Sequence, residues 1–160
     1  MKTMKWHQIL ALTVLLAVNT VSCSKRDDEP NKNANVREQL VGRKWQIVSE
    51  KPDTKADFNG DGIPDDEFHQ FAQECELDNY TRYTDDGFAM DYDDGKLCTE
   101  TAPEKYKWEF TDNNTKIKVT KKDEAYTMKI ISINENSLIV SRPYAVFGIN
   151  VNVTVTYKKI

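Results

Sequence analysis

The C-terminal part of the chain carries the pattern that most constrains its fold. From Ile149 to Tyr157, five apolar residues alternate strictly with polar ones. Successive side chains of a β-strand point to opposite faces, so this period of two is typical of a strand with one buried face. The segment therefore predicts a half-buried strand, and similar short segments recur upstream.

Seven further segments have alternating or β-rich patterns bounded by turn residues. They cover residues 44–50, 80–84, 88–92, 105–110, 116–120, 125–133 and 137–142. Turn signals such as Asp85-Asp86-Gly87 and Asp112-Asn113-Asn114 separate them. Most of the links are short, as in an antiparallel meander.

These patterns predict an all-β domain of eight antiparallel strands. We expect the strands to close into an up-and-down barrel, because closure removes exposed sheet edges; a two-sheet sandwich is the alternative. Val36, Leu40 and Val41 have near-helical spacing, which predicts a short helix or turn that plugs one end. The residues expected to face inwards are Trp45, Tyr80, Phe88, Trp108, Tyr126 and Met128.

The interior of such a barrel has room for side chains or for one small ligand. We favour a largely filled interior, with Trp45, Arg82 and Trp108 as candidate ligand-binding residues around a pocket at the mouth. Arg142-Pro143-Tyr144 and Phe147-Gly148 are expected in the last loop, either as the rim of that pocket or as a cap.

The N-terminus carries the features of an export signal. Lys2 and Lys5 precede an apolar run over residues 9–18, which is the layout of a secretory signal peptide. The run is too short to cross a hydrocarbon core of about 30 Å, which needs roughly 20 apolar residues. We therefore predict that residues 1–22 are a removable signal peptide.

Thr20-Val21-Ser22-Cys23 resembles a bacterial lipobox, although Thr20 stands where Leu is more common. The resemblance implies that Cys23 becomes the N-terminus and carries a diacylglycerol thioether together with an acylated amine, palmitate for instance. Two or more acyl chains attach a protein stably to a membrane. An ordinary signal peptide followed by an incidental cysteine is the alternative.

The residues after Cys23 bear on where the anchored protein is placed. Ser24 is not the Asp that some sorting systems read as a signal for retention at the inner membrane. Asp27-Asp28-Glu29 resembles a surface-export signal of lipoproteins, and a solvated charged spacer is the alternative. We expect an outer-membrane lipoprotein that faces the periplasm or the cell surface.

The rest of the chain has the size of one domain. Residues 23–36 are predicted to be a flexible tether, and residues 37–160 the barrel domain. The chain has 22 Lys and Arg against 26 Asp and Glu, and no basic block. This composition argues against nucleic acid or anionic lipid as a partner.

The cysteine count bears on how the domain is stabilised. If Cys23 is lipidated, Cys75 and Cys98 remain. Exported compartments are oxidising, so an even remainder favours a disulfide. Two buried free thiols or a metal pair are the alternatives, but a metal site needs more soft ligands, and His69 is the only histidine after the leader.

In the order of its motifs, the chain from Leu40 onwards resembles the bacterial lipocalin-like lipoproteins. Leu40-Val41-Gly42 followed by Trp45 looks like the start of such a domain, although lipocalins usually have one residue between Gly and Trp rather than two. The later motifs are the loop 57–62, Cys75, the Asp78-Asn79-Tyr80 strand start, Asp86-Gly87, Cys98 and Trp108. The resemblance implies an eight-stranded barrel with a Cys75–Cys98 bridge. It implies little about a ligand, because a fold does not determine function.

Residues 57–65 repeat the first half of a calcium-binding loop. Side-chain oxygens of Asp57, Asn59 and Asp61 occupy positions 1, 3 and 5, with Gly62 at 6, the Ile63 carbonyl at 7 and Asp65 at 9. Position 12 is Phe68 rather than Glu, so Asp66 or Glu67 would have to substitute. We expect weak, structural calcium binding, and a solvated turn is the alternative.

No pattern in the sequence indicates catalysis. A Ser, His and Asp set, a nucleophile elbow and a phosphate-binding loop are not recognisable, and His69 is expected to be packed or exposed rather than catalytic. We therefore expect a non-enzymatic small-ligand-binding or accessory module. The alternative is a structural or interaction domain with a filled core that docks to an outer-membrane complex.

Overall fold

The computed structural model describes residues 32–98, 103–146 and 149–160. The predicted signal peptide, Cys23 and most of the predicted tether lie outside these residues. The described elements are α1 (Lys32–Leu40), β1 (Lys44–Pro52), the short 3-10 helix η1 (His69–Phe71), β2 (Tyr80–Tyr83), β3 (Phe88–Tyr92), β4 (Lys105–Thr111), β5 (Lys116–Thr120), β6 (Ala125–Ile133), β7 (Ser137–Val146) and β8 (Ile149–Lys159).

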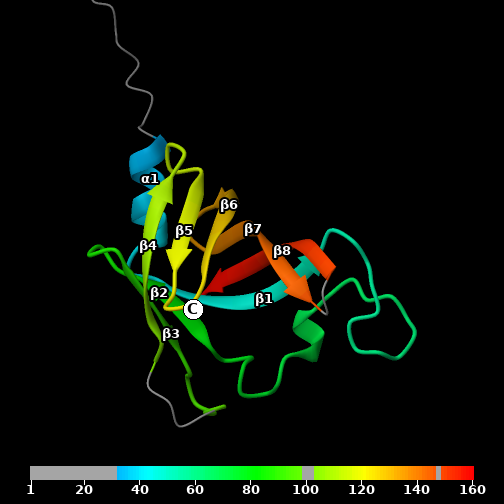
Figure 1. Cartoon of the computed structure of the whole chain (residues 1–160). Coiled ribbons are helices and arrows are strands. Elements are labelled where there is room, and N and C mark those ends of the chain that lie inside the picture. The colour runs from blue at the N-terminus through cyan, green and yellow to red at the C-terminus, as the bar shows by residue number, and fades with distance from the viewer. Residues whose placement is uncertain (1–31, 99–102, 147–148) are drawn as a thin grey trace, which may run out of the picture.

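The strands form a closed antiparallel barrel in chain order, and β1 pairs with β8 to close it (Figure 1). The up-and-down barrel expected from the sequence is confirmed, and the sandwich alternative is wrong. β3, β5 and β6 have the predicted bounds, and the other strands differ by at most two residues at either end, except β7.

β7 runs four residues beyond its predicted end, through Pro143 to Val146. Its pairing with β6 ends at Ser141, whereas its pairing with β8 continues to Val146. Proline has no N–H and is tolerated where a strand lacks a neighbour on one side. Pro143 therefore sits in a strand, and Arg142 and Tyr144 are strand residues rather than loop residues.

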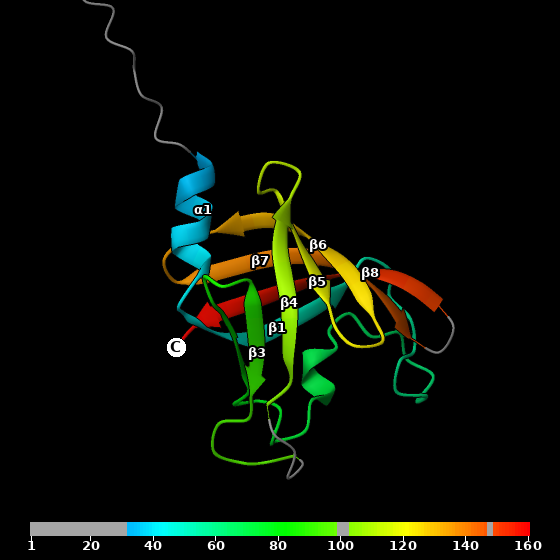
Figure 2. The same cartoon turned by 60° about the vertical axis from the view of Figure 1, so that its left-hand side comes forward.

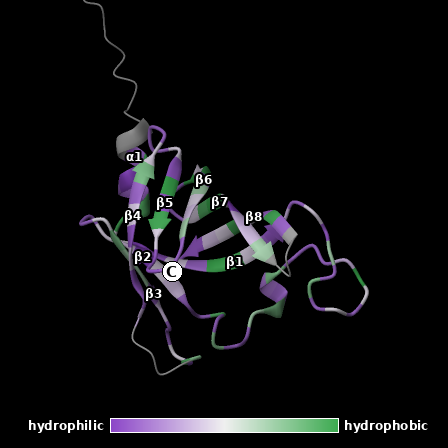
Figure 3. Ribbon diagram, in the orientation of Figure 1, coloured by the Kyte–Doolittle hydropathy of each residue, from purple (hydrophilic) through white to green (hydrophobic). Residues whose placement is uncertain are grey.

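The apolar and polar residues that alternate along the strands lie on the inner and outer faces of the barrel, respectively. Along β8, Val151, Val153 and Val155 are buried, while the residues between them are exposed or half-buried. Figure 3 shows the same change between hydrophobic and hydrophilic residues along the strands. The hydrophobic effect thus selects which face of each strand turns inwards.

Helix α1 closes one end of the barrel, beside β6 and the hairpin between β2 and β3 (Figure 2). Leu40 is fully buried, and its carbonyl accepts a hydrogen bond of 2.9 Å from the Trp45 indole. Arg37 donates to the Asp85 side chain and carbonyl at the β2–β3 hairpin. The expected plug is confirmed, but the helix begins at Lys32, inside the segment predicted to be a tether.

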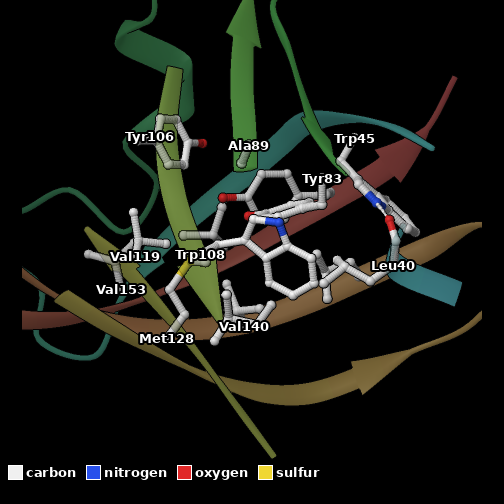
Figure 4. Close-up of a cluster of buried hydrophobic side chains, with 14 of the residues drawn as sticks. Leu40, Trp45, Tyr83, Ala89, Tyr106, Trp108, Val119, Met128, Val140 and Val153 are labelled. Carbon is white, nitrogen blue, oxygen red and sulfur yellow. Dashed lines mark hydrogen bonds between the residues drawn. The ribbon is translucent and has the colours of Figure 1, made fainter. Parts of the chain in front are cut away.

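The core fills this closed end. Figure 4 shows the Tyr83 and Trp108 rings in contact, and their centroids are 5.4 Å apart in an edge-to-face arrangement. The Trp108 indole donates to the carbonyls of Thr84 and Phe88, so its polar atom is satisfied. The buried cluster comprises Leu40, Trp45, Tyr83, Ala89, Tyr106, Trp108, Ile117, Val119, Met128, Leu138, Val140, Val151, Val153, Val155 and Tyr157.

Two of the six predicted inward residues lie on the outer face instead. Tyr80 stacks on Tyr92, with ring centroids 4.8 Å apart, and Phe88 lies under the Lys105 ammonium. The buried residues of these two strands are Tyr83, three residues after Tyr80, and Ala89, directly after Phe88. The predictions for Tyr80 and Phe88 were wrong because both faces of these strands carry apolar side chains.

The other end of the barrel carries the longest connection, the mouth loop (residues 53–79) between β1 and β2 (Figures 1 and 2). Cys75 in this loop forms a disulfide with Cys98 beyond β3, with the two Cα atoms 5.2 Å apart. The predicted bridge is confirmed, and the free-thiol and metal-pair alternatives are wrong. Among the described residues, no helix has the length and apolar character needed to cross a membrane.

Candidate functional site

A hollow of about 260 Å³ lies inside the barrel towards the mouth loop. We call it the inner chamber. Trp45, Ile47 and Met128 line it on the side of the packed core. The inward-facing tyrosines that also line it are Tyr83, Tyr106, Tyr126 and Tyr157.

One wall of the inner chamber is a hydrogen-bonded group around Asp91. The Asp91 carboxylate accepts hydrogen bonds of 2.7 Å from the Thr81 hydroxyl and 2.8 Å from the Tyr106 hydroxyl. Lys121 Nζ lies 3.4 Å from Asp91 and 3.0 Å from Glu104. Burial lowers the pKa of Lys121, but Glu104 and Asp91 outweigh it and raise the pKa overall, so Lys121 is charged at neutral pH.

Arg142 is the second cation that lines the inner chamber. One of its terminal nitrogens donates to Glu50 at 3.1 Å, and both side chains are 21% exposed. Its Nε is buried and has no hydrogen-bond partner within the described part of the chain. The guanidinium lies 5.9 Å from the ring centroid of Tyr126 and 5.2 Å from that of Tyr144.

The tyrosines of the chamber act as hydroxyl donors. Burial raises the pKa of all four phenols above its usual value. The charge of Arg142 lowers the pKa of Tyr126 and Tyr157, but it does not outweigh burial. The hydroxyls therefore stay protonated at neutral pH. That of Tyr106 donates to Asp91, and those of the other three tyrosines can donate hydrogen bonds to a ligand.

A second hollow of about 480 Å³ adjoins the inner chamber beneath the mouth loop. We call it the vestibule. The two hollows share Ile47, Glu76, Asn79 and Arg142 as lining residues. The aromatic residues of the vestibule are Phe58, Phe68, Phe71 and Tyr144, together with His69.

The mouth loop is held against β1 by its own residues. The Phe68 N–H donates to the Glu50 carbonyl at 2.8 Å. The Phe58 and Phe68 rings meet edge to face, with centroids 4.2 Å apart, and Phe58 is buried. The Glu67 carboxylate accepts hydrogen bonds from the Ser49 hydroxyl and the Glu50 N–H. The loop that covers the vestibule is therefore fixed to the barrel by hydrogen bonds and by packing.

The three residues predicted to bind a ligand have different positions. Trp45 lines the inner chamber. Trp108 belongs to the packed end, where both of its hydrogen bonds go to backbone carbonyls. Arg82 is exposed on the outer face, because its neighbour Tyr83 points inwards. The prediction for Arg82 is therefore corrected: the cation that reaches both hollows is Arg142, named from sequence only as a possible part of the rim.

Three charged residues of the site have a recognisable sequence signal that was missed. Asp91 follows Ala89, Lys121 follows Val119, and Arg142 follows Val140 in the inward phase of their strands; these apolar neighbours are fully buried. A charged residue in that phase is costly to bury unless it is paired. Such positions mark the polar part of the barrel interior.

The predicted calcium loop lies in the mouth loop. The Asp57 carboxylate accepts backbone N–H groups of Gly60, Asp61 and Gly62 at 2.6 to 3.1 Å. Asn59 donates to the Asp61 carboxylate, whose other oxygen accepts the Ile63 N–H, and Asp65 accepts the Phe58 N–H. Within the described segments, no three His, Cys, Asp or Glu side chains converge to hold a metal ion. The calcium site stays a prediction.

His69 lines the vestibule and is half-buried. Its backbone N–H donates to Glu67 at 3.2 Å. Its imidazole has no hydrogen-bond partner among the residues that the structure describes. A nucleophile and base pair built on His69 is therefore not assembled in this part of the chain.

Comparisons were made with solved structures, with curated proteins and with protein families. Two solved structures of bovine odorant-binding protein are similar to the chain, a deswapped triple mutant and a complex with a selenium-containing odorant. Each is 17% identical with a TM-score of 0.42 and covers 76% of this chain, which corresponds to 74% and 71% of theirs. A search of curated proteins finds no significant match.

The family comparison covers the larger part of the domain. Residues 40–140 match the family described as a lipocalin-like domain. This range includes the plug residue Leu40, strands β1 to β6, the mouth loop and both bridged cysteines. The chain therefore belongs to the lipocalin-like domain family.

Proposed function

We propose that this protein is a lipid-anchored cell-envelope protein whose barrel binds a small organic ligand in the inner chamber and the vestibule. The observation that carries the proposal is the pair of adjoining hollows, of about 260 and 480 Å³, inside a disulfide-bonded barrel. Small-molecule sites typically enclose about 300–1,000 Å³ and combine aromatic walls with a few polar groups. The tyrosines, Arg142 and the vestibule phenylalanines form such a combination.

A binding role fits the distribution of side chains better than a purely structural one. A domain that serves only as a docking module has no need of paired charges in its interior, because burying charges is costly. Here Asp91, Lys121 and Arg142 are kept at inward positions next to hollow space. We therefore favour ligand binding over the alternative of a filled domain that docks to an envelope complex, and over catalysis.

The neutral fluorescent probe N-phenyl-1-naphthylamine tests this role. We expect its emission to rise when the purified full-length protein is added. Thr81→Phe fills the inner chamber, since Thr81 lines it, and should abolish the increase. Thr127→Phe places the same ring on the exposed outer face of β6 and should leave the increase unchanged. Equal emission with and without protein, at concentrations where the protein is folded, contradicts ligand binding.

The membrane attachment is tested separately. We expect mass spectrometry of the protein from its native envelope to give an N-terminus at Cys23 that carries acyl chains, and Cys23→Ala to release the protein from the membrane. Proteolysis of intact cells then distinguishes a surface-exposed domain, which is digested, from one that faces the periplasm. An unacylated N-terminus at another residue contradicts the anchor but leaves the binding proposal unaffected.

A further inference from the structure

The two cations that reach the inner chamber differ in how their charge is balanced. Lys121 is within 3.4 Å of two carboxylates, those of Asp91 and Glu104. Among the residues that the structure describes, Arg142 has one carboxylate partner, Glu50. A surplus of negative charge therefore surrounds Lys121, whereas the pair of Arg142 and Glu50 is neutral. Of the two, Arg142 is the cation better placed to accept another anion.

Arg142 also has unused hydrogen-bonding capacity. A guanidinium has five N–H groups in a planar fork. One terminal nitrogen is engaged by Glu50, and the buried Nε has no partner within the described residues. A buried donor without a partner lowers the stability of the fold, because it has given up its hydrogen bonds to water. A ligand with an acceptor oxygen next to Arg142 would remove this cost.

Further donors lie on the same side of the chamber. Tyr126 and Tyr157 line it, and both phenols lie within the electrostatic reach of Arg142. Neither hydroxyl has a hydrogen-bond partner in the described part of the chain. Arg142 and these two hydroxyls therefore form a set of hydrogen-bond donors that favours a ligand with several hydrogen-bond acceptors. A carboxylate, with two oxygens and about four lone pairs, matches a planar guanidinium best.

The vestibule differs from the inner chamber in character. Phe58, Phe68 and Phe71 line only the vestibule, whereas the tyrosine hydroxyls and Asp91 line the inner chamber. Arg142 lines both. An apolar group placed in the inner chamber would leave its polar atoms without water, which is costly. The polar end of a ligand therefore belongs at Arg142, and its apolar end belongs among the phenylalanines.

We propose that the ligand is a small amphipathic carboxylate whose carboxylate binds Arg142 and the hydroxyls of Tyr126 and Tyr157, while its apolar part lies in the vestibule. This inference rests on the proposed function, because it names the chemical class of ligand for the same hollows. Glu50 becomes a negative regulator of affinity in this arrangement, since it competes with the ligand for Arg142.

The test compares three probes that share one apolar part. Isothermal titration at neutral pH and low salt measures the binding of 4-phenylbutyrate, 4-phenylbutanol and 4-phenylbutylamine to the full-length protein. We expect the acid to bind about tenfold to hundredfold more tightly than the alcohol, since hydrogen bonds to charged groups are the stronger ones. The amine should bind most weakly.

Variants of the ion pair then give changes of opposite sign. Arg142→Gln should remove the preference for the acid over the alcohol. Glu50→Gln should tighten binding of the acid by a few-fold and leave the alcohol unchanged, because it frees Arg142 from its counter-charge. Arg82→Gln removes an arginine from the outer face of the same barrel and should change nothing. If Arg142→Gln unfolds because Glu50 is left unpaired, the double variant Glu50→Gln/Arg142→Gln replaces it.

The outcomes separate this inference from the proposed function. Equal binding of acid and alcohol, tightest binding of the amine, or weaker acid binding in Glu50→Gln overturns the carboxylate proposal. In each of these cases the proposed ligand-binding role stands, since a probe has bound. If none of the three compounds and no N-phenyl-1-naphthylamine binds, both proposals are overturned.

Discussion

The Glu67 side chain joins the mouth loop to the barrel wall through hydrogen bonds to β1. One carboxylate oxygen accepts the Ser49 hydroxyl at 2.6 Å, and the other accepts the N–H groups of Glu50 at 2.5 Å and His69 at 3.2 Å. Burial raises the pKa of this carboxyl, but the three hydrogen bonds together outweigh burial and lower it below the usual value of 4.5. Because hydrogen bonds to the charged form produce this shift, the charged form holds the loop.

We predict that Glu67→Gln lowers the free energy of unfolding by about 1–2 kcal/mol at neutral pH, since it weakens several hydrogen bonds to a charge. A lowered folded-state pKa contributes stability above the unfolded value of about 4.5 and loses it as the pH falls through the folded value. The difference between wild type and variant should therefore shrink in acid. Urea unfolding over a pH series measures it, with the exposed Glu135→Gln as a control. A difference that does not vary with pH contradicts the prediction.

Individual residues also show how far sequence reasoning reaches. Trp45 was placed correctly because a large apolar residue in alternating phase has one compatible face. Arg82 was misplaced because β2 is short and has aromatic residues on both faces, so its sequence does not show which face turns inwards. Phe88 and Ala89 illustrate the same limit: the smaller of the two residues is the one that is fully buried. Which of two apolar faces turns inwards depends on the neighbouring strands, which local patterns do not contain.

At the scale of elements, helix α1 closes one end of the barrel. Val36, Leu40 and Val41 suggested a plug from their spacing alone. Two contacts hold it. The Trp45 indole bonds to the Leu40 carbonyl five residues earlier, whereas the contact from Arg37 to Asp85 joins segments 48 residues apart and was not predictable from local patterns. The helix end thereby becomes part of the core.

We predict that Leu40→Ala lowers the free energy of unfolding by about 2–4 kcal/mol, because Leu40 is fully buried among the core residues and its removal leaves a cavity. Leu97→Ala is the matched control: Leu97 is 63% exposed and its loss should change stability by less than about 0.5 kcal/mol. Thermal or urea unfolding measures both. Similar values for the two variants would show that α1 is not docked in solution.

The loop over residues 57–65 is the element whose chemistry was most specific in the sequence. We propose that it binds calcium weakly. At a calcium concentration tenfold above the dissociation constant, binding should stabilise the fold by about 1.4 kcal/mol. Thermal unfolding with millimolar calcium, with magnesium as the control ion, measures this shift, and Asp57→Asn should abolish it. No heat on titration with millimolar calcium, together with unchanged melting under a chelator, contradicts the site.

At the scale of the whole molecule, the barrel has one packed half and one hollow half. The apolar phase of the strands predicted the packed half, and the family resemblance predicted the order of the loops. The hollow half depends on three charges that line one chamber: Asp91 on β3, Lys121 directly after β5, and Arg142 on β7. Meetings of this kind arise from barrel closure and strand stagger, so alternation marks the inward phase but not which charges face each other.

The Cys75–Cys98 bridge ties the two loops of the hollow half together. The bridge encloses a sequence separation of 23 residues, and Glu76 and Asn79, which follow Cys75 closely, line both hollows. On the chain-entropy model, closing such a loop stabilises the fold by about 3 kcal/mol. We predict that the Cys75→Ser/Cys98→Ser variant has a free energy of unfolding lower than the wild type by that amount, and therefore unfolds at a lower urea concentration. It should also bind the neutral probe more weakly, because the lining of the vestibule is less constrained.

Reductant should lower the stability of the wild type to that of the variant and leave the variant unchanged. If reduced and oxidised wild type unfold at the same urea concentration, the bridge does not hold the mouth in place. The vestibule is then held by the hydrogen bonds of Glu67 and Phe68 to β1 and by the Phe58–Phe68 contact.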